Sequence, residues 1–160
     1  MQRPTGTRRR PPPSSDIKYL NWAEELGTKS NCVRRRVGAV LVAKQGVIAK
    51  AWNGVSARYR SCLEAGCPRC KRGGRVGTGY DSCICLHAEQ RALALAARAG
   101  KSVRGATLYV SLRPCLACLN LAIEAGVLRV VYKGHWVYDR LLESRYNRLA
   151  SRLRDFECVE

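Results

Sequence analysis

The chain has 160 residues, which is long enough for one domain with a buried core. Its 29 lysines and arginines and 12 acidic residues give a net charge of +17, which favours a ligand that carries phosphate, although an ordinary solvated surface can have the same composition. Its apolar runs are too short to cross a bilayer, which argues against a membrane protein. Nine cysteines without an apolar secretory leader predict metal ligation in a reducing cytoplasm.

Residues 1–15 are rich in arginine, proline, threonine and serine, and they predict a disordered basic arm. The catalytic domain is expected to cover residues 16–160. Asp16 is predicted to be the N-cap of a first helix, which has an apolar stripe and stops near Gly27.

Two strand-like runs follow at residues 37–43 and 47–52, and the short link between them predicts a hairpin. The next stretch, 53–81, is rich in cysteine, glycine and arginine and is too irregular for a core element. A loop of this length inside a compact domain normally has a function or is held in place by a cross-link such as a metal ion.

The second half of the chain alternates between helices and strands. The predicted elements are a helix at 87–98, a strand at 107–112, a helix at 115–126, a strand at 128–132, a helix at 138–153 and a strand at 156–159. This alternation implies parallel pairing, with helices covering both faces of a mixed sheet. Functional sites in such folds gather where strands lead into helices.

A metal-binding pattern lies at the start of two of these predicted helices. Cys115 and Cys118 are three residues apart, so both can face one ion, and a helix N-terminus favours their thiolate form. With His87 they make three ligands, which leaves the fourth position of a catalytic zinc site open for water. Glu89 is then the general acid and base that moves the protons of the zinc-activated water. His-x-Glu followed by Pro-Cys-x-x-Cys is a known signature of zinc nucleobase deaminases.

The sequence resembles the deoxycytidylate deaminases over residues 16–160. The resemblance rests on residues 37–40, 52–54, 86–90, 105–110, 114–118 and 126–132. It implies an α/β fold of the cytidine deaminase type, a three-layer sandwich in which a five-stranded mixed sheet has helices on both faces. It also implies one catalytic Zn²⁺, conversion of dCMP to dUMP with release of ammonia, and assembly into dimers or hexamers.

The same resemblance suggests where the nucleoside lies. It implies that Asn53 contacts the sugar, that the backbone of Ala88 binds the pyrimidine, and that Ser111 lines the pocket. Trp136 falls where relatives place an aromatic residue, so it either walls the pocket or fills core.

The substrate phosphate needs cationic or backbone donors. Arg58, Arg98 and Arg113 are candidates because they lie near the motifs in the sequence. Arg113 departs from the family pattern, since many relatives have an uncharged or acidic residue directly before the proline at 114.

Seven further cysteines lie outside the catalytic motif; Cys158 in the terminal strand is most simply a core residue, and the other six are candidate metal ligands. These six are Cys32, Cys62, Cys67, Cys70, Cys83 and Cys85. Four of them can close a tetrahedral zinc site and so offset the entropy of ordering a long loop. By the resemblance, Cys32, Cys62 and Cys85 match residues that hold part of a structural zinc in some phage enzymes. We therefore expect a second zinc bound by four of the six, the alternative being buried thiols or occasional disulfides.

Two other functions compete with dCMP deamination. The high positive charge is typical of a polynucleotide deaminase acting on tRNA adenosine or on single-stranded DNA or RNA cytosine, and it predicts at least weak nucleic-acid binding. However, tRNA adenosine deaminases usually have a short link between the equivalents of Gly54 and His87, whereas this link exceeds 30 residues. A catalytically inert zinc-finger-like module is the third possibility, and Glu89 argues against it.

Overall fold

The computed structural model describes residues 12–56, 58–72 and 82–159. Of the arm predicted at 1–15, residues 1–11 lie outside this description, while the first helix, α1 (Ser14–Thr28), already includes Ser14. Asp16 is not the N-cap, as we had predicted; Pro13 occupies that position, and the Asp16 side chain is buried in the first turn. The prediction failed because the carboxylate of Asp16 has a tertiary partner, Arg129, rather than a local one.

One sheet of five strands forms the centre of the molecule, as predicted. The strands are β1 (Gly38–Ala43), β2 (Gly46–Trp52), β3 (Thr107–Leu112), β4 (Arg129–Gly134) and β5 (Asp155–Cys158), in the order β2-β1-β3-β4-β5. Strand β1 is antiparallel to β2 and β3, whereas β3, β4 and β5 are parallel to one another. The sheet is therefore mixed, and the alternating second half of the chain builds its parallel part.

The predicted hairpin joins β1 to β2. Its register pairs Ala43 with Gly46, which leaves Lys44 and Gln45 as the turn. Gly46 has a φ of 104°, a conformation that side chains with a Cβ rarely adopt.

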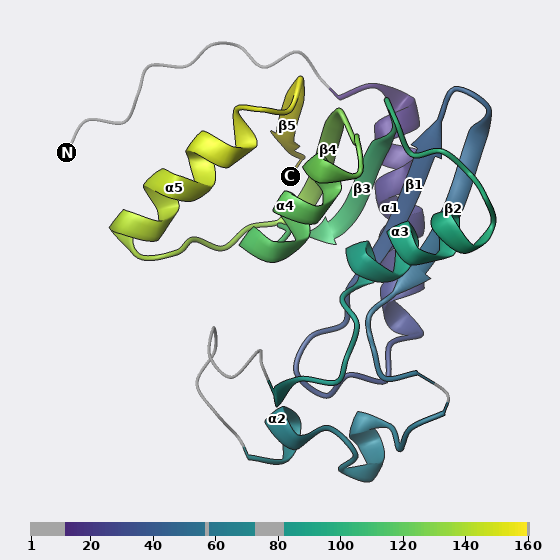
Figure 1. Ribbon diagram of the computed structural model, residues 1–160, viewed down its shortest axis with the longest axis vertical. Coiled ribbons are helices and arrows are strands. Elements are labelled where there is room, and N and C mark those ends of the chain that lie inside the picture. Colours follow the sequence, from purple (N-terminus) through teal and green to yellow (C-terminus); the bar gives the residue numbers. More distant parts are fainter. Residues whose placement is uncertain (1–11, 57, 73–81, 160) are drawn as a thin grey trace.

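Helices cover both faces of the sheet. They are α1 on one face and α3 (Ala88–Arg98), α4 (Leu116–Glu124) and α5 (Arg140–Ala150) on the other (Figure 1). Because successive strand residues point to opposite faces, Val40 packs with Leu20 of α1, whereas Leu41 and Leu108 belong to the larger core beneath the other helices. The three-layer α/β fold of the cytidine deaminase type is confirmed.

The cysteine-rich stretch between β2 and α3 lies beyond one end of the sheet (Figure 1). Among the residues described, its helical elements include a 3₁₀ turn, η1 (Cys62–Glu64), and a four-residue helix, α2 (Pro68–Lys71), so its irregularity was correctly predicted. Across 12–56, 58–72 and 82–159, every helix is too short or too polar to span a membrane.

A buried ion pair ties α1 to the sheet. Arg129 donates to both carboxylate oxygens of Asp16, at 2.8 and 2.6 Å, and the hydroxyl of Tyr109 donates to Asp16 Oδ1 at 2.8 Å. Burial by itself would raise the pKa of Asp16, but the hydrogen bonds from Arg129 and Tyr109 hold it below its usual value of 3.8.

This pair predicts a specific loss of stability in acid. A carboxyl whose pKa is lower in the folded state contributes stability above its unfolded pKa, and that contribution disappears as the pH falls through the folded value. We expect the difference in free energy of unfolding between the wild type and Asp16→Asn, on the order of 1–2 kcal/mol near neutral pH, to shrink between about pH 5 and about pH 2. Urea unfolding across this range measures it, and a difference that does not change with pH would contradict the prediction.

Candidate active site

Three potential metal ligands meet where two helices begin. His87 is the N-cap of α3, and its backbone N–H donates to Oε1 of Gln90 at 3.0 Å, which holds the start of the helix. Cys115 is the N-cap of α4, and Cys118 lies in the first turn of that helix. The sequence prediction that both motifs open helices is correct.

The side chains of His87, Cys115 and Cys118 converge. Nδ1 of His87 lies 3.5 Å from Sγ of Cys115 and 3.3 Å from Sγ of Cys118, and the three ligand atoms are all within 4.8 Å of one another. A tetrahedral zinc with its usual bond lengths of about 2.0 Å to nitrogen and about 2.3 Å to sulfur separates such ligands by about 3.6 Å. One imidazole and two thiols at this spacing fit zinc.

The thiol of Cys115 is primed to bind as a thiolate. Hydrogen bonds from Cys118 and then from His87 lower the pKa of Cys115 to about 4, although burial opposes this shift. The hydrogen bond with Cys115 in turn raises the pKa of His87. The N-terminus of α4 favours the same charge distribution.

Glu89 lies in the first turn of α3, two residues after His87, and only 4% of it is exposed. Burial is the main reason that its pKa rises to about 7, and the nearby Cys115 thiolate adds to the effect. A carboxyl with a pKa near neutrality can both accept and donate a proton, which is the property required of a general acid and base.

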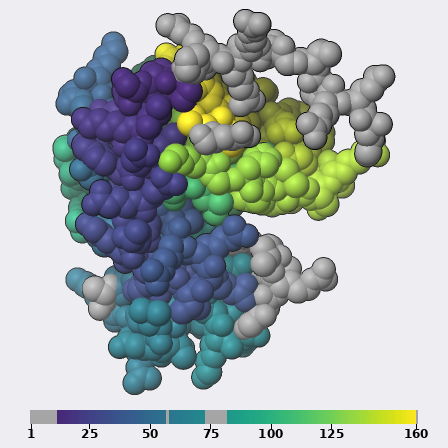
Figure 2. Space-filling view, turned by 180° about the vertical axis from the view of Figure 1, so that it is seen from behind, coloured from purple at the N-terminus to yellow at the C-terminus, as the bar shows by residue number. Residues whose placement is uncertain are grey.

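A cavity of about 520 Å³ opens onto these residues. It has His87, Ala88, Glu89 and Cys115 in its wall. The rest of its lining comes from three places: the loop before β1 with Asn53 and the cysteine-rich stretch, the end of β3 with Leu112 and Arg113, and the segment from Trp136 to Leu142. Figure 2 shows the molecule hollowed between the blue and teal segments below and the yellow-green C-terminal elements above.

The structure places Asn53, Ala88 and Trp136 in the cavity wall, where the resemblance had put them. The Asn53 carboxamide also accepts from the Val37 N–H at 2.8 Å and donates to the backbone of the loop before β1. Ser111 is not in this wall. It faces a separate shallow pocket, and its hydroxyl accepts from the backbone N–H of Gly38 at 3.0 Å.

Arg113 lines the cavity but is committed to an internal ion pair. Its two terminal nitrogens donate to the Glu143 carboxylate at 3.1 and 2.7 Å, and one of them also donates to the Trp136 carbonyl at 2.6 Å. The indole of Trp136 donates back to the Arg113 carbonyl at 2.8 Å, and Glu143 also accepts from the Tyr138 N–H at 3.1 Å. This network fastens the segment after β4 over the cavity.

Other arginines occupy the cavity wall. Arg58 and Arg98 are exposed and lie outside the lining, whereas Arg34, Arg35 and Arg69 belong to it. Sequence reasoning missed these three as site residues. The available signal was their place among the cysteines, since Arg34 and Arg35 follow Cys32 closely and Arg69 lies within the C-x-x-C of the loop.

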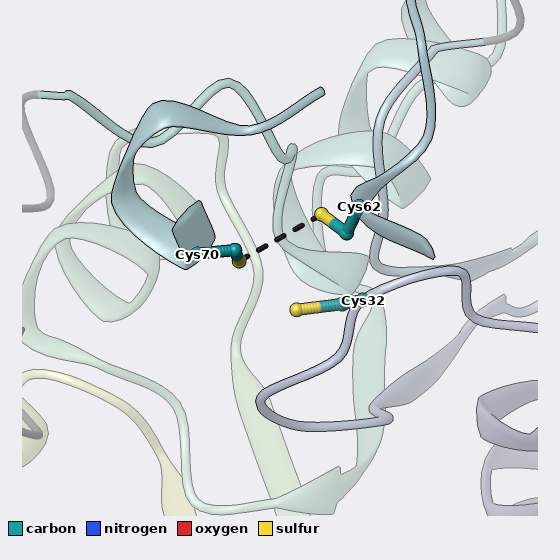
Figure 3. A group of neighbouring side chains, drawn as sticks. All are labelled: Cys32, Cys62 and Cys70. Atoms are coloured by element: carbon teal, nitrogen blue, oxygen red, sulfur yellow. Dashed lines mark hydrogen bonds between the residues drawn. The ribbon is translucent and has the colours of Figure 1, made fainter. Parts of the chain in front are cut away.

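The six remaining predicted metal ligands gather in one cluster beside the cavity. Two groups of mutually close sulfur atoms are present, Cys32 with Cys62 and Cys70, and Cys62 with Cys67 and Cys85. Figure 3 shows the first group, with side chains from the loop after α1, from η1 and from α2 pointing toward one another. Cys83 joins the cluster through its contact with Cys67, whose sulfur atom is 4.0 Å from its own.

An α/β sandwich with a His-Cys-Cys triplet at two helix N-termini and a buried glutamate beside it defines the class of cytidine deaminase-like zinc hydrolases. The model for the cytidine and deoxycytidylate deaminase zinc-binding region matches residues 13–133. The chain belongs to this family.

Curated relatives and solved structures agree with this assignment. Deoxycytidylate deaminase from a Mycobacterium phage is 38% identical over 125 residues, covering 75% of this chain and 94% of the phage protein. The Schizosaccharomyces pombe deoxycytidylate deaminase is 37% identical over 90% of this chain, which spans only 44% of the yeast protein. The dCMP deaminase of cyanophage S-TIM5, solved with dCMP and dUMP, superposes with a TM-score of 0.70 at 25% identity and covers 94% of this chain and 100% of its own.

Proposed function

We propose that the chain catalyses the hydrolytic deamination of dCMP to dUMP and ammonia. The observation that carries the proposal is the His87, Cys115 and Cys118 triplet beside buried Glu89 in the wall of a nucleotide-sized cavity with an arginine-lined side. Deoxycytidylate deaminases are among the relatives that the chain resembles, including the phage protein of which it covers 94%.

Zinc, when bound, supplies Lewis-acid activation of a water molecule at neutral pH. Glu89 would take one proton from that water and deliver it to the ring nitrogen. It would then take the second proton, from the hydroxyl group formed at carbon 4, and deliver it to the departing amine. The backbone of Ala88 binds the pyrimidine, Asn53 contacts the sugar, and the Trp136 side of the cavity excludes bulk water. Attack at carbon 4 and loss of ammonia then leave the uracil ring of dUMP.

The arginines of the cavity wall are suited to the substrate phosphate. Arg34→Ala and Arg69→Ala are each expected to raise KM for dCMP by about 10–100-fold, because a hydrogen bond to a charged group contributes about 1.5–3 kcal/mol. Turnover of deoxycytidine, which has no phosphate, should change little. Steady-state kinetics on both substrates measures this, with exposed Arg58→Ala as the matched control; an equal loss on deoxycytidine would contradict a role in phosphate binding.

The cysteine cluster is the second part of the proposal, as a structural zinc site. Six cysteines from three segments of the chain lie together. A zinc ion there offsets the entropy of ordering a stretch that contains very little regular structure.

The function is tested by ammonia release from dCMP, dCTP, deoxycytidine, CMP and a tRNA anticodon stem. Turnover that is fastest with dCMP supports the proposal, whereas activity on the RNA alone would place the chain among the tRNA adenosine deaminases, one of which is 30% identical over 72% of this chain. Nucleic-acid binding, a dimeric or hexameric assembly and a cytoplasmic location stay predictions.

A further inference from the structure

The cysteine cluster contains more thiols than one zinc ion can bind. A tetrahedral zinc takes four ligands, whereas six cysteines pack together here, and the four most buried of them form a hydrophobic cluster with Val55. The two groups of close sulfur atoms share Cys62 and otherwise have different members. A single ion placed in one group therefore leaves thiols of the other group unused.

Two further distances between sulfur atoms match the spacing of zinc ligands. Zinc–sulfur bonds of about 2.3 Å place two ligands of one tetrahedral zinc about 3.8 Å apart. Cys62 and Cys70 are 3.8 Å apart, and Cys67 and Cys83 are 4.0 Å apart. Each pair is spaced as two ligands of one zinc, and the pairs have no member in common.

We infer that the cluster binds two zinc ions, which share the sulfur atoms of Cys62 and Cys85. These two sulfurs lie 3.0 Å apart, and Cys62 belongs to both close groups. Cys85 belongs to the group with Cys67 and also hydrogen-bonds Cys32 of the other group. Both thiols therefore contact members of both groups, as a bridging thiolate has to.

The four other cysteines complete the two coordination shells in pairs. By this inference one ion is bound by Cys32 and Cys70, which form a close group with Cys62, and the other by Cys67 and Cys83, whose sulfur atoms are 4.0 Å apart. Each zinc then has two terminal and two bridging thiolates, and every thiol releases its proton to solvent when it binds. This inference rests on the structural zinc site proposed above and adds a second ion to it.

The second ion would stabilise one wall of the catalytic cavity. Cys32, Cys83 and Cys85 line the catalytic cavity, and Arg69 enters the same wall from α2, between Cys67 and Cys70. A helix of four residues is unstable by itself in water. Zinc bound through Cys67 and Cys83 would connect α2 to the segment that leads into His87, and so hold Arg69 against the cavity.

The number of zinc ions in the purified full chain tests the inference. After dialysis against metal-free buffer, native mass spectrometry and elemental analysis are expected to find three zinc ions per chain in the wild type, one catalytic and two in the cluster, and two in His87→Ala. X-ray absorption at the zinc edge should also show scattering from a neighbouring metal atom, which only a bridged pair produces. Two ions in the wild type with no metal–metal scattering would overturn the inference.

Substitution locates the second ion. Cys67→Ser and Cys83→Ser are each expected to lower the count from three to two, whereas Cys158→Ser, a cysteine outside the cluster whose sulfur contacts the Lys133 carbonyl, should keep three. If a cluster variant fails to fold, the wild-type count and the metal–metal scattering still decide. Three ions in a chain that does not turn over dCMP would support the cluster and refute the proposed function, and two ions in an active enzyme would do the reverse.

Discussion

Replacement of Glu89 by glutamine is expected to lower kcat for dCMP by about 10²–10⁴-fold, the usual contribution of a general acid and base. Glutamine has nearly the same shape as glutamate but cannot take a proton from water and pass it to the base. The metal ligands are His87, Cys115 and Cys118. Because Glu89 is not one of them, the catalytic zinc should remain bound. Ammonia release and zinc content, measured on the same preparation, test both halves of this expectation.

The matched control is Glu124→Gln, the same chemical change at an exposed position on α4, which should leave kcat and zinc content at wild-type values. The Glu89→Gln variant should still bind dCMP, because the cavity keeps its shape, and calorimetry measures this binding. An inactive variant that has also lost its catalytic zinc would show that Glu89 acts through the metal site. A fully active variant would show that Glu89 is not the general acid and base.

Replacement of Glu143 by glutamine is expected to destabilise the protein by about 3 kcal/mol, since it leaves a buried guanidinium without its counter-charge. The side chain of Arg113 is only 2% exposed, and that of Glu143 is 22% exposed. For a chain of this length the loss corresponds to a fall in Tm of roughly 6–12 °C. The KM for dCMP should rise as well, because Glu143 and Arg113 together hold the Trp136 segment over the cavity.

Glu24→Gln provides the comparison. Glu24 pairs with Lys133 at 2.6 Å, but both side chains are substantially exposed, at 50% and 27%, so this change should cost no more than about 1 kcal/mol. Thermal and urea unfolding of the two zinc-loaded variants measures the difference. Equal stabilities would mean that the Arg113 pair adds nothing beyond an ordinary surface contact.

The hydrophobic patterns of the sequence predicted most of the fold. Thr107–Leu112 is a strand with the bounds expected, and the hairpin and the three later helices lie where apolar spacing, Gly and Pro placed them. These signals are local, so they can be read in one chain. Element ends were less accurate: the last helix, Arg140–Ala150, is shorter at both ends than the predicted 138–153, and its start is fixed by Asp139, which caps its N-terminus.

Predictions that depended on distant partners were less successful. Asp16 looked like a helix cap, yet its carboxylate binds Arg129, more than 100 positions away in the sequence. Arg113 looked like a phosphate ligand because it adjoins the metal motif, but Glu143 comes from a later helix to neutralise it. Nothing in the local sequence of either residue indicates its partner.

The sequence by itself determined the class of chemistry, because His87, Glu89, Cys115 and Cys118 are close in sequence within two short motifs, and helix geometry then orients each motif. It also predicted a second metal site among the extra cysteines, which stays a proposal. Only the tertiary structure decided which arginines face the cavity and which thiols form the two overlapping groups. Both depend on segments that meet only when the sheet brings the loops before β1, after β2 and before α3 to one end of the molecule.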